Sequence, residues 1–295
     1  MFPDIRSGIP LGVSTPELRH YRLDVVTACR AADLRSLRLA LAGLLQYVPL
    51  RRLHVITARA NFPKFRRALG DEVALVDEDA YLPGVTLEAL RKLPLPGFPD
   101  GAGWYFQQLL KFNFCFCEPA EEYFLIWDAD TVPLRPLEFF DEQGRMLFTL
   151  AEEEHPPYFE NYRKLLGEEP RREFSFIAQH CIVQKSILRE MLGKIEARFP
   201  GDENWAWKIM RHVEGASVNL FSEYEMYGHY VKNHYPARAA YRRLPWLRHG
   251  SRAVGGLPSA GDLQRLGQDY AFASFESSHM FLRRWVRRVR GWFRG

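Results

Sequence analysis

Residues 123–131 have the sequence YFLIWDADT, in which five apolar residues are followed directly by two aspartates two positions apart. The apolar run predicts a strand that is buried on both faces, as in the centre of a parallel sheet. Because side chains alternate along an extended chain, we expect Asp128 and Asp130 to point to the same side. Two neighbouring carboxylates repel one another unless a cation or a proton lies between them. The stretch therefore predicts a central strand with an acidic site at its carboxyl end.

Strands and helices alternate on the amino-terminal side of this stretch. The expected strands are residues 23–27, 53–57 and 73–76, and helical patterns lie between them. This alternation is typical of an α/β fold with a mostly parallel sheet flanked by helices. Ligands of such sheets bind outside the carboxyl ends of the strands. We therefore expect Thr27, Asp77 and Asp128, which follow or end three of these strands, to lie near one another.

The second half of the chain has a less regular pattern. Strands are expected at residues 146–150 and 181–183, and a helix from Ser186 to Phe199. Neither an internal repeat nor a linker is visible, so we expect a single continuous domain over about residues 20–280. Its halves would be residues 20–135 and 136–280.

Composition excludes several classes of protein. The 295 residues are 47% hydrophobic and 26% charged, unlike a disordered, collagenous or multi-span membrane chain. The net charge of +4 depends on residues 281–295, which hold six arginines and no acid. The rest carries 34 basic and 36 acidic residues, a net charge of −2. A nucleic-acid interface needs a basic face, so we expect no nucleic-acid partner.

Four cysteines occur in the chain, and none has the spacing of a zinc site or of a disulfide framework. The first residues lack the basic and apolar regions of a signal peptide, and no apolar segment of 18 residues exists. We therefore expect a cytoplasmic protein with reduced thiols.

The two aspartates have the chemistry of a hard-cation site. Mg²⁺ and Mn²⁺ prefer oxygen ligands, keep several waters and take substrate phosphates as further ligands. We expect Asp128 and Asp130 to hold such an ion against a diphosphate; the alternative is a surface turn. Gln108 and Lys111 share a helix face with Trp104 and are candidates for contacting the donor.

The same sequence motif occurs in a different class of enzyme. An apolar strand followed by DxDxT resembles the haloacid-dehalogenase phosphatases, in which the first aspartate attacks phosphorus and the second is the acid/base. Those enzymes carry the motif on their first core strand, whereas residues 1–127 precede it here. Their later metal site also needs an apolar strand before an acidic pair, which neither Asp202 nor Asp262 has.

The ordered set of motifs resembles the GT-A fold of nucleotide-sugar glycosyltransferases. More narrowly, it resembles a bacterial family of largely uncharacterised glycosyltransferase-like proteins linked to surface polysaccharides. The segments that carry the resemblance are GWYFQQLLK at 103–111, DAD at 128–130, SFIAQH at 175–180 and FSEYEMYG at 221–228. The resemblance covers roughly residues 20–280.

It implies transfer of a sugar from a nucleotide diphosphate donor to a glycan or lipid-linked acceptor, with Mn²⁺ or Mg²⁺ at Asp128 and Asp130. It also implies that residues 20–135 bind the nucleotide sugar and residues 136–280 the acceptor. Some GT-A enzymes use a late histidine as a third metal ligand, which makes His279 a candidate. Asp77 is a candidate for contacting the base or ribose of the donor, and Thr27 for lying beside it.

An inverting transferase also needs a general base for the acceptor hydroxyl. Glu225 is our first candidate and Glu223 the second, because both lie in an aromatic segment where a carboxyl pKa tends to rise. The two share one side of a strand but not of a helix. His180 and Tyr227 are candidates for acceptor binding. A retaining reaction, which needs no base, stays open.

Residues 281–295 have a distinct amphipathic sequence pattern. Placed on a helix, their apolar side chains occupy one arc and their six arginines the opposite arc. That pattern is typical of a helix lying on anionic lipid, although docking on the protein body or on a partner helix would also use it. We expect peripheral attachment to the inner face of the membrane. The non-enzymatic alternative is a peripheral membrane protein that binds a nucleotide sugar without turnover.

Overall fold

The computed structural model describes residues 21–71, 73–117 and 121–276. The elements of its first half, in chain order, are β1 (Leu23–Ala28), α2 (Leu34–Tyr47), β2 (Leu50–Thr57), η1 (Arg59–Asn61), α3 (Phe62–Leu69), β3 (Ala74–Asp77), α4 (Glu78–Tyr81), α5 (Leu87–Leu90), α6 (Ala102–Asn113), η2 (Phe114–Phe116), β4 (Tyr123–Trp127) and β5 (Thr131–Pro133). The second half contains β6 (Met146–Thr149), α7 (Pro156–Leu166), β7 (His180–Gln184), α8 (Lys185–Arg198), α9 (Trp205–His212), α10 (Glu223–His234), η3 (Pro236–Arg238), β8 (Ala239–Arg242), β9 (Trp246–Leu247), α11 (Gly250–Val254), α12 (Ala260–Asp269) and β10 (Phe272–Ser274).

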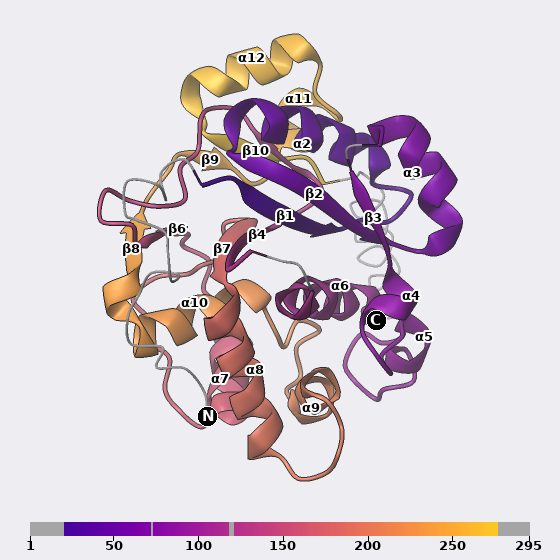
Figure 1. Cartoon of the computed structure of the whole chain (residues 1–295), viewed down its shortest axis with the longest axis vertical. Coiled ribbons are helices and arrows are strands. Elements are labelled where there is room, and N and C mark those ends of the chain that lie inside the picture. Colours follow the sequence, from indigo (N-terminus) through magenta and orange to yellow (C-terminus); the bar gives the residue numbers. More distant parts are fainter. Residues whose placement is uncertain (1–20, 72, 118–120, 277–295) are drawn as a thin grey trace, which may run out of the picture.

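The central sheet has five strands in the order β3-β2-β1-β4-β7. The first four are parallel, and β7 runs antiparallel to β4. All five residues of β4 are buried, as their apolar character predicts for an inner strand. The predicted fold class, α/β with a mostly parallel sheet flanked by helices, is confirmed (Figure 1).

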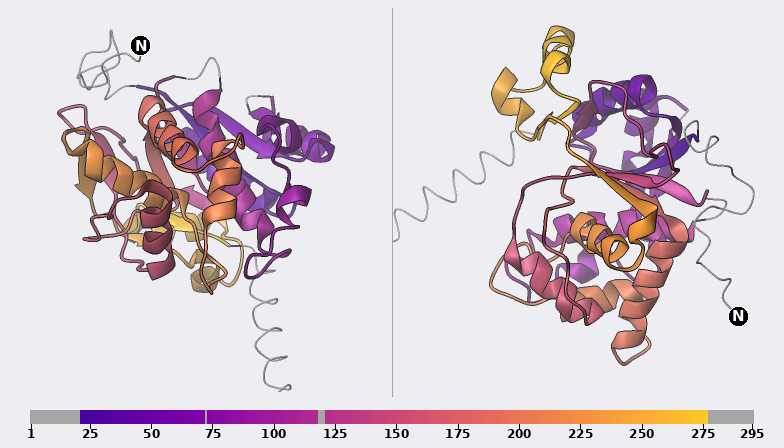
Figure 2. Two further views of the ribbon diagram at one scale, coloured as in Figure 1. Left: turned by 90° about the horizontal axis from the view of Figure 1, so that it is seen from below. Right: turned by 90° about the vertical axis from the view of Figure 1, so that its left-hand side faces the viewer.

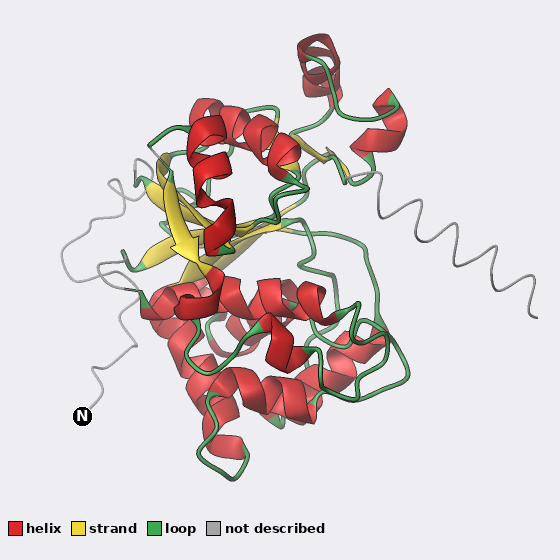
Figure 3. Ribbon diagram, turned by 90° about the vertical axis from the view of Figure 1, so that its right-hand side faces the viewer, coloured by secondary structure: helices red, strands yellow, loops and turns green. Residues whose placement is uncertain are grey.

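Helices cover both faces of this sheet. In Figure 3, α2 and α3 lie on one face, and α6 lies on the other together with helices of the second half. The α2 helix buries Leu34, Leu37 and Leu44 on its inner stripe, which is the 3.6-residue periodicity of the sequence. One hydrophobic cluster contains residues of both halves, from Leu23 to Phe272, so the halves share a core.

Two small sheets extend the fold beyond β4. β5 starts directly after Asp130 and pairs antiparallel with β10, which in turn pairs with β9; β6 pairs with β8. A second, smaller apolar cluster packs the β5–β10 pair against α2, α11 and α12, which lie together at one end of the molecule (Figures 1 and 2). This pairing brings the end of the described chain, Glu276, to the DAD turn.

Several boundaries differ from the sequence-based expectation. β2 begins at Leu50, three residues earlier than predicted. α8 begins at Lys185, one residue earlier than predicted, and the hydroxyl of Ser186 donates to Glu122. Among the described residues, no helix combines the length and apolar character that crossing a membrane requires.

Candidate active site

The DAD turn follows β4 at the carboxyl edge of the sheet. The Asp128 N–H donates to the Gln179 carbonyl (3.0 Å), and the Thr131 N–H donates to the Asp128 carbonyl (3.0 Å). The Phe275 N–H donates to the Asp130 carbonyl (2.8 Å), so β10 supports the turn from the far end of the chain. These backbone contacts fix both aspartates at the position where open α/β sheets bind ligands.

Asp128 is held by two side chains from two helices. Its Oδ1 accepts hydrogen bonds from Lys111 Nζ of α6 (2.7 Å) and from the Tyr224 hydroxyl of α10 (2.8 Å). Lys111 also forms an ion pair with Glu223, the first residue of α10. One buried ammonium therefore joins the DAD turn to the first turn of α10.

The side chains of this bridge are withdrawn from water to different degrees. Those of Lys111 and Glu223 are 2% and 5% exposed, and that of Asp128 is 22% exposed. Burial alone would lower the pKa of Lys111, but the charges of Asp128 and Glu223 outweigh burial and raise it. Burial raises the pKa of Glu223, and Lys111 acts in the opposite direction. Lys111 therefore stays charged, and its charge allows two acids to share the interior.

Asp130 lies in a different electrostatic environment. Its side chain is partly buried, and no basic side chain among the described residues lies within ion-pair distance. Loss of water and, to a lesser degree, the negative charges of Asp128, Glu276 and Asp33 together raise the pKa of Asp130 to about 7. A carboxyl group in such surroundings gains from a bound cation.

The residues fit a divalent cation that is only partly held by protein. Over the described ranges, no group of three or more histidine, cysteine, aspartate and glutamate side chains is arranged as a metal cage. Mg²⁺ is commonly bound by one or two carboxylates, with phosphate oxygens and waters completing its shell. Asp128 and Asp130 provide that donor set. His279, predicted as a third ligand, lies outside the described residues.

The two candidate bases point to opposite sides of α10. Because the segment is a helix, Glu223 faces Lys111 while Glu225 faces the segment around Ser175. The Glu225 carboxylate accepts hydrogen bonds from the Ser175 hydroxyl and the Phe176 N–H (3.4 Å), and it lies 3.0 Å from His229 Nε2. The structure brings Glu223 to Asp128 and leaves Glu225 enclosed among buried groups.

The two predicted acceptor residues lie in the core instead. His180 stacks on Trp127 (ring centroids 4.8 Å apart) and contacts the Thr149 hydroxyl through Nε2 (3.2 Å). Burial lowers its pKa to about 3, so the ring is neutral at physiological pH. Tyr227 is fully buried, and its hydroxyl accepts from the Gln184 N–H (2.7 Å). Apolar neighbours from distant parts of the chain enclose both rings.

The three remaining donor candidates differ in position. Gln108 is buried and bonds the Glu223 N–H (3.0 Å) and the Trp104 carbonyl (3.1 Å), so it fixes the start of α10. Thr27 lies on β1, the strand next to β4, and its buried hydroxyl has no hydrogen-bond partner in the described part of the chain. Asp77 caps α4 at the end of β3, which is three strand positions and about 14 Å from β4. Asp77 and Asp128 are therefore not brought together, contrary to expectation.

Sequence reasoning missed three contributors to the site. Tyr224 binds Asp128, but a tyrosine in an aromatic segment gives no local sign of such a role. Gln179, whose carbonyl accepts from Asp128, is the single non-glycine residue with positive φ (62°) among the described residues. Such backbone strain clusters at functional sites. Glu276 reaches Asp130 only through the β5–β10 pairing.

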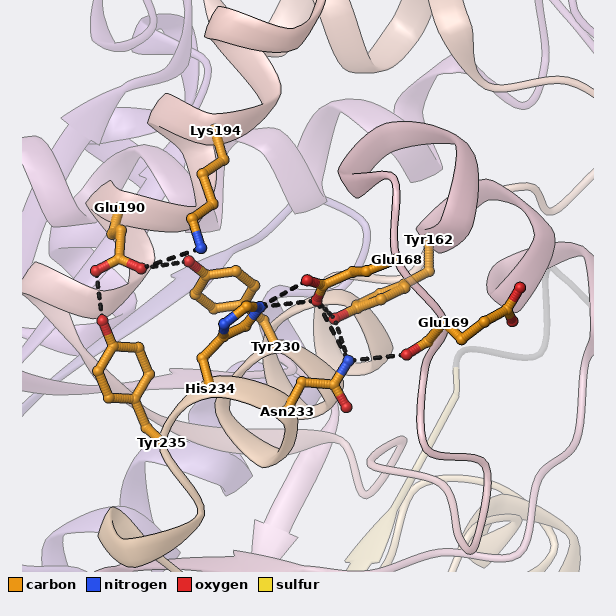
Figure 4. Close-up of polar contacts among 9 residues, drawn as sticks. All are labelled: Tyr162, Glu168, Glu169, Glu190, Lys194, Tyr230, Asn233, His234 and Tyr235. Atoms are coloured by element: carbon orange, nitrogen blue, oxygen red, sulfur yellow. Dashed lines mark hydrogen bonds and ion pairs between the residues drawn. The ribbon is translucent and has the colours of Figure 1, made fainter.

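A second polar cluster fixes the other end of α10 (Figure 4). Glu168 accepts from the Tyr162 hydroxyl (2.6 Å) and contacts His234 Nε2 (2.8 Å). Glu190 accepts from the hydroxyls of Tyr230 and Tyr235. Both carboxylates thus accept hydrogen bonds from neighbouring side chains, and these bonds join α10 to α7 and α8.

Two cavities of the described part lie away from the aspartates, with volumes of about 150 and 220 Å³. The smaller one lies between the amino end of β1 and residues 137–140, and the larger one lies between residues 151–154 and 172–175. Neither is lined by Asp128 or Asp130.

Comparisons with known proteins give one family and several distant structures. A sequence profile described as "Family of unknown function (DUF6492)" matches residues 27–245. No curated protein matches the chain. The structure is similar to that of mouse xyloside xylosyltransferase 1 in its apo form, with a TM-score of 0.44, 13% identity, and coverage of 86% of this chain and 97% of that chain. It is also similar to the galactosyltransferase LgtC in complex with donor and acceptor sugar analogues, with a TM-score of 0.41, 13% identity, and coverage of 86% and 87%.

Proposed function

The chain belongs to the DUF6492 family, whose function is unknown, and we propose that it is a metal-dependent glycosyltransferase. It would move a sugar from a nucleoside diphosphate donor to a glycan or lipid-linked acceptor in surface polysaccharide assembly. The observation that carries this proposal is the pair of carboxylates on the DAD turn. Asp128 is tied to Lys111, whereas Asp130 has no basic partner among the described residues and faces other acids.

The roles of the chain's own residues follow from these contacts. Asp128 and Asp130 would hold Mn²⁺ or Mg²⁺, which when bound neutralises the charge that develops on a departing diphosphate. Lys111 and Tyr224 keep Asp128 in one orientation, so the site needs little rearrangement during the reaction. Glu223 is the better placed of the two candidate bases because it shares Lys111 with Asp128. Glu225 stays a prediction that mutagenesis decides.

Calorimetry with UDP and GDP, each with and without Mn²⁺, tests the proposal. Wild-type protein should bind one of the two nucleotides only with Mn²⁺. Asp130→Asn should weaken this binding at least about tenfold, since metal sites lose affinity by such factors even when their supporting groups are removed. Asp71→Asn is the matched control because its side chain is 94% exposed. Metal-independent binding, or full affinity in Asp130→Asn, would contradict the proposal.

The same protein distinguishes the two other hypotheses. A phosphohydrolase of the DxDxT type should capture beryllofluoride on Asp128, whereas the transferase should not, because its reaction forms no aspartyl phosphate. A non-catalytic binding protein should bind nucleotide and metal yet release no nucleoside diphosphate from any sugar nucleotide.

We further propose that the protein works in the cytoplasm, attached to the inner face of the membrane. The support is the sequence of residues 281–295, with arginines on one helical arc and apolar side chains on the other. These residues lie outside the described part of the chain. A lipid-linked acceptor would be met at that surface.

A further inference from the structure

The face of α6 that carries Lys111 also carries Gln108 and Trp104. Gln108 Nε2 donates to the Trp104 carbonyl, and Gln108 Oε1 accepts from the Glu223 N–H. Trp104, Gln108 and Lys111 therefore form one line along the helix, at i, i+4 and i+7. Trp104 lies seven residues, or about 10 Å of helix rise, from Lys111. A group bound at Trp104 would therefore lie about 10 Å along α6 from the Lys111 end of the site.

Trp104 is the partly exposed member of an aromatic group. Its ring meets Tyr105 edge to face (4.8 Å, 84°) and lies parallel to the ring of Tyr158 from α7 (6.4 Å, 18°). The ring of His155 packs on Tyr158 (4.4 Å), and His155 Nε2 lies 2.8 Å from the Asn219 carbonyl. Neighbours on α6, on α7 and in the loop before α10 fix these rings, and the Trp104 side chain remains partly exposed.

Acidic groups of the site lie close to this aromatic group. Burial raises the pKa of the Tyr158 hydroxyl, and the charges of Glu223 and Glu225 raise it further, which keeps the phenol neutral. Glu223 thus lies within electrostatic reach of Tyr158 on one side and is paired with Lys111 on the other. An apolar ring face beside hydrogen-bonding polar groups is the pattern of a small-molecule site.

We propose that Trp104, supported by Tyr158, is the platform on which a sugar ring of the acceptor stacks. This inference rests on the proposed transferase function and names its acceptor subsite. A pyranose ring presents a face of C–H groups, which an aromatic ring covers, and a rim of hydroxyls, which carboxylates bind. With the ring on Trp104, the acidic site lies further along α6, where Gln108 binds the Glu223 N–H. The platform replaces His180 and Tyr227, which the core encloses.

Saturation-transfer NMR of the full chain with UDP and Mn²⁺ tests this assignment. The probes are the methyl glycosides of glucose, galactose, mannose, xylose and N-acetylglucosamine. Trp104→Leu keeps apolar volume but removes the aromatic face, and Trp104→Phe keeps a smaller face. Trp207→Ala is the control, because Trp207 is equally a partly exposed tryptophan but lies on α9, where its Nε1 donates to the Gly84 carbonyl (2.9 Å).

Wild-type protein should transfer saturation to the ring protons of at least one glycoside. Trp104→Leu should weaken its binding at least about tenfold, which corresponds to about 1.4 kcal/mol. Trp104→Phe should retain most of the binding, and Trp207→Ala should retain all of it. All variants should bind UDP and Mn²⁺ equally in calorimetry.

The platform at Trp104 and the transferase function can be refuted separately. If UDP and Mn²⁺ bind but no glycoside does, or if Trp104→Leu binds the glycoside like wild type, the platform is refuted and the transferase proposal stands. If no nucleotide binds to the wild-type protein, the transferase proposal fails and the platform fails with it.

Discussion

Replacing Lys111 by methionine should test the charge bridge of the site directly. The Lys111 side chain is 2% exposed and contacts two carboxylates, Asp128 at 2.7 Å and the nearly buried Glu223. Methionine fills a similar volume, so the main change is the loss of one positive charge. Breaking a buried ion pair by removing one partner costs about 3–5 kcal/mol, because the remaining charge has no compensation. We expect Lys111→Met to lower the free energy of unfolding by that amount at pH 8.

A double-mutant cycle with Glu223→Gln isolates the cause. In the double variant the second buried charge is also removed, so the cost should decrease to about 1–2 kcal/mol, the scale of lost hydrogen bonds. The pH dependence has a defined sign. Burial already raises the pKa of Glu223, and losing Lys111 should raise it further. A group with a raised folded-state pKa contributes stability below its unfolded pKa and loses it as pH rises, so Lys111→Met should be less damaging at pH 5 than at pH 8.

Urea unfolding followed by tryptophan fluorescence measures these differences. Lys92→Met is the control, because Lys92 pairs with Glu88 on the surface, with side chains 74% and 81% exposed. Such a pair contributes about 0–1 kcal/mol. A loss below about 1 kcal/mol in Lys111→Met, or a double variant whose loss equals the sum of the single losses, would refute the bridge.

Three further predictions concern the core, α10 and the chain end. Because burial lowers the pKa of His180 to about 3, the unfolded chain binds a proton below pH 6.5 that the folded chain does not. Stability should therefore fall from pH 6.5 toward pH 3, by about 2 kcal/mol at pH 5, and His180→Gln should flatten this dependence in urea titrations. Glu225→Gln should cost about 1–3 kcal/mol through its contacts with Ser175 and His229 and leave UDP affinity intact. A folded Glu225→Gln protein whose transfer rate drops by about 10²–10⁴ would identify Glu225 as the base instead. Deleting residues 281–295 should release the protein from phosphatidylserine vesicles without changing its circular dichroism; an unfolded product would assign them to the core.

Local sequence patterns predict much of the sheet, because each strand is a short apolar run with a sharp end. The strand at 123–127 is predicted to the residue. The antiparallel direction of β7 and the pairing of β5 with β10 depend on contacts between distant segments. No local pattern encodes those contacts, so the sequence alone does not predict that Glu276 approaches Asp130.

The candidate site shows the same division. Asp128 is named from the sequence because it follows an apolar strand, Lys111 because it shares a helix face with Gln108, and Glu223 because it lies in an aromatic segment. The structure brings the three together. Aromatic and histidine side chains suit both cores and ligand sites, and tertiary packing decides between the two. That ambiguity explains why the sequence does not single out Tyr224 and why it suggests His180 for acceptor binding.

The Lys111 contacts also limit how this chain can be divided or recombined. Lys111 and Asp128 come from one half of the sequence, whereas Glu223 and Tyr224 come from the other. A fragment ending near residue 135 would lack Glu223. Lys111, which is buried in the full chain, would then be exposed with one of its two carboxylate partners missing. A chimera whose carboxyl-terminal portion comes from a homologue must therefore have a matching anion at the start of α10. Otherwise Lys111 loses one of its two carboxylate partners.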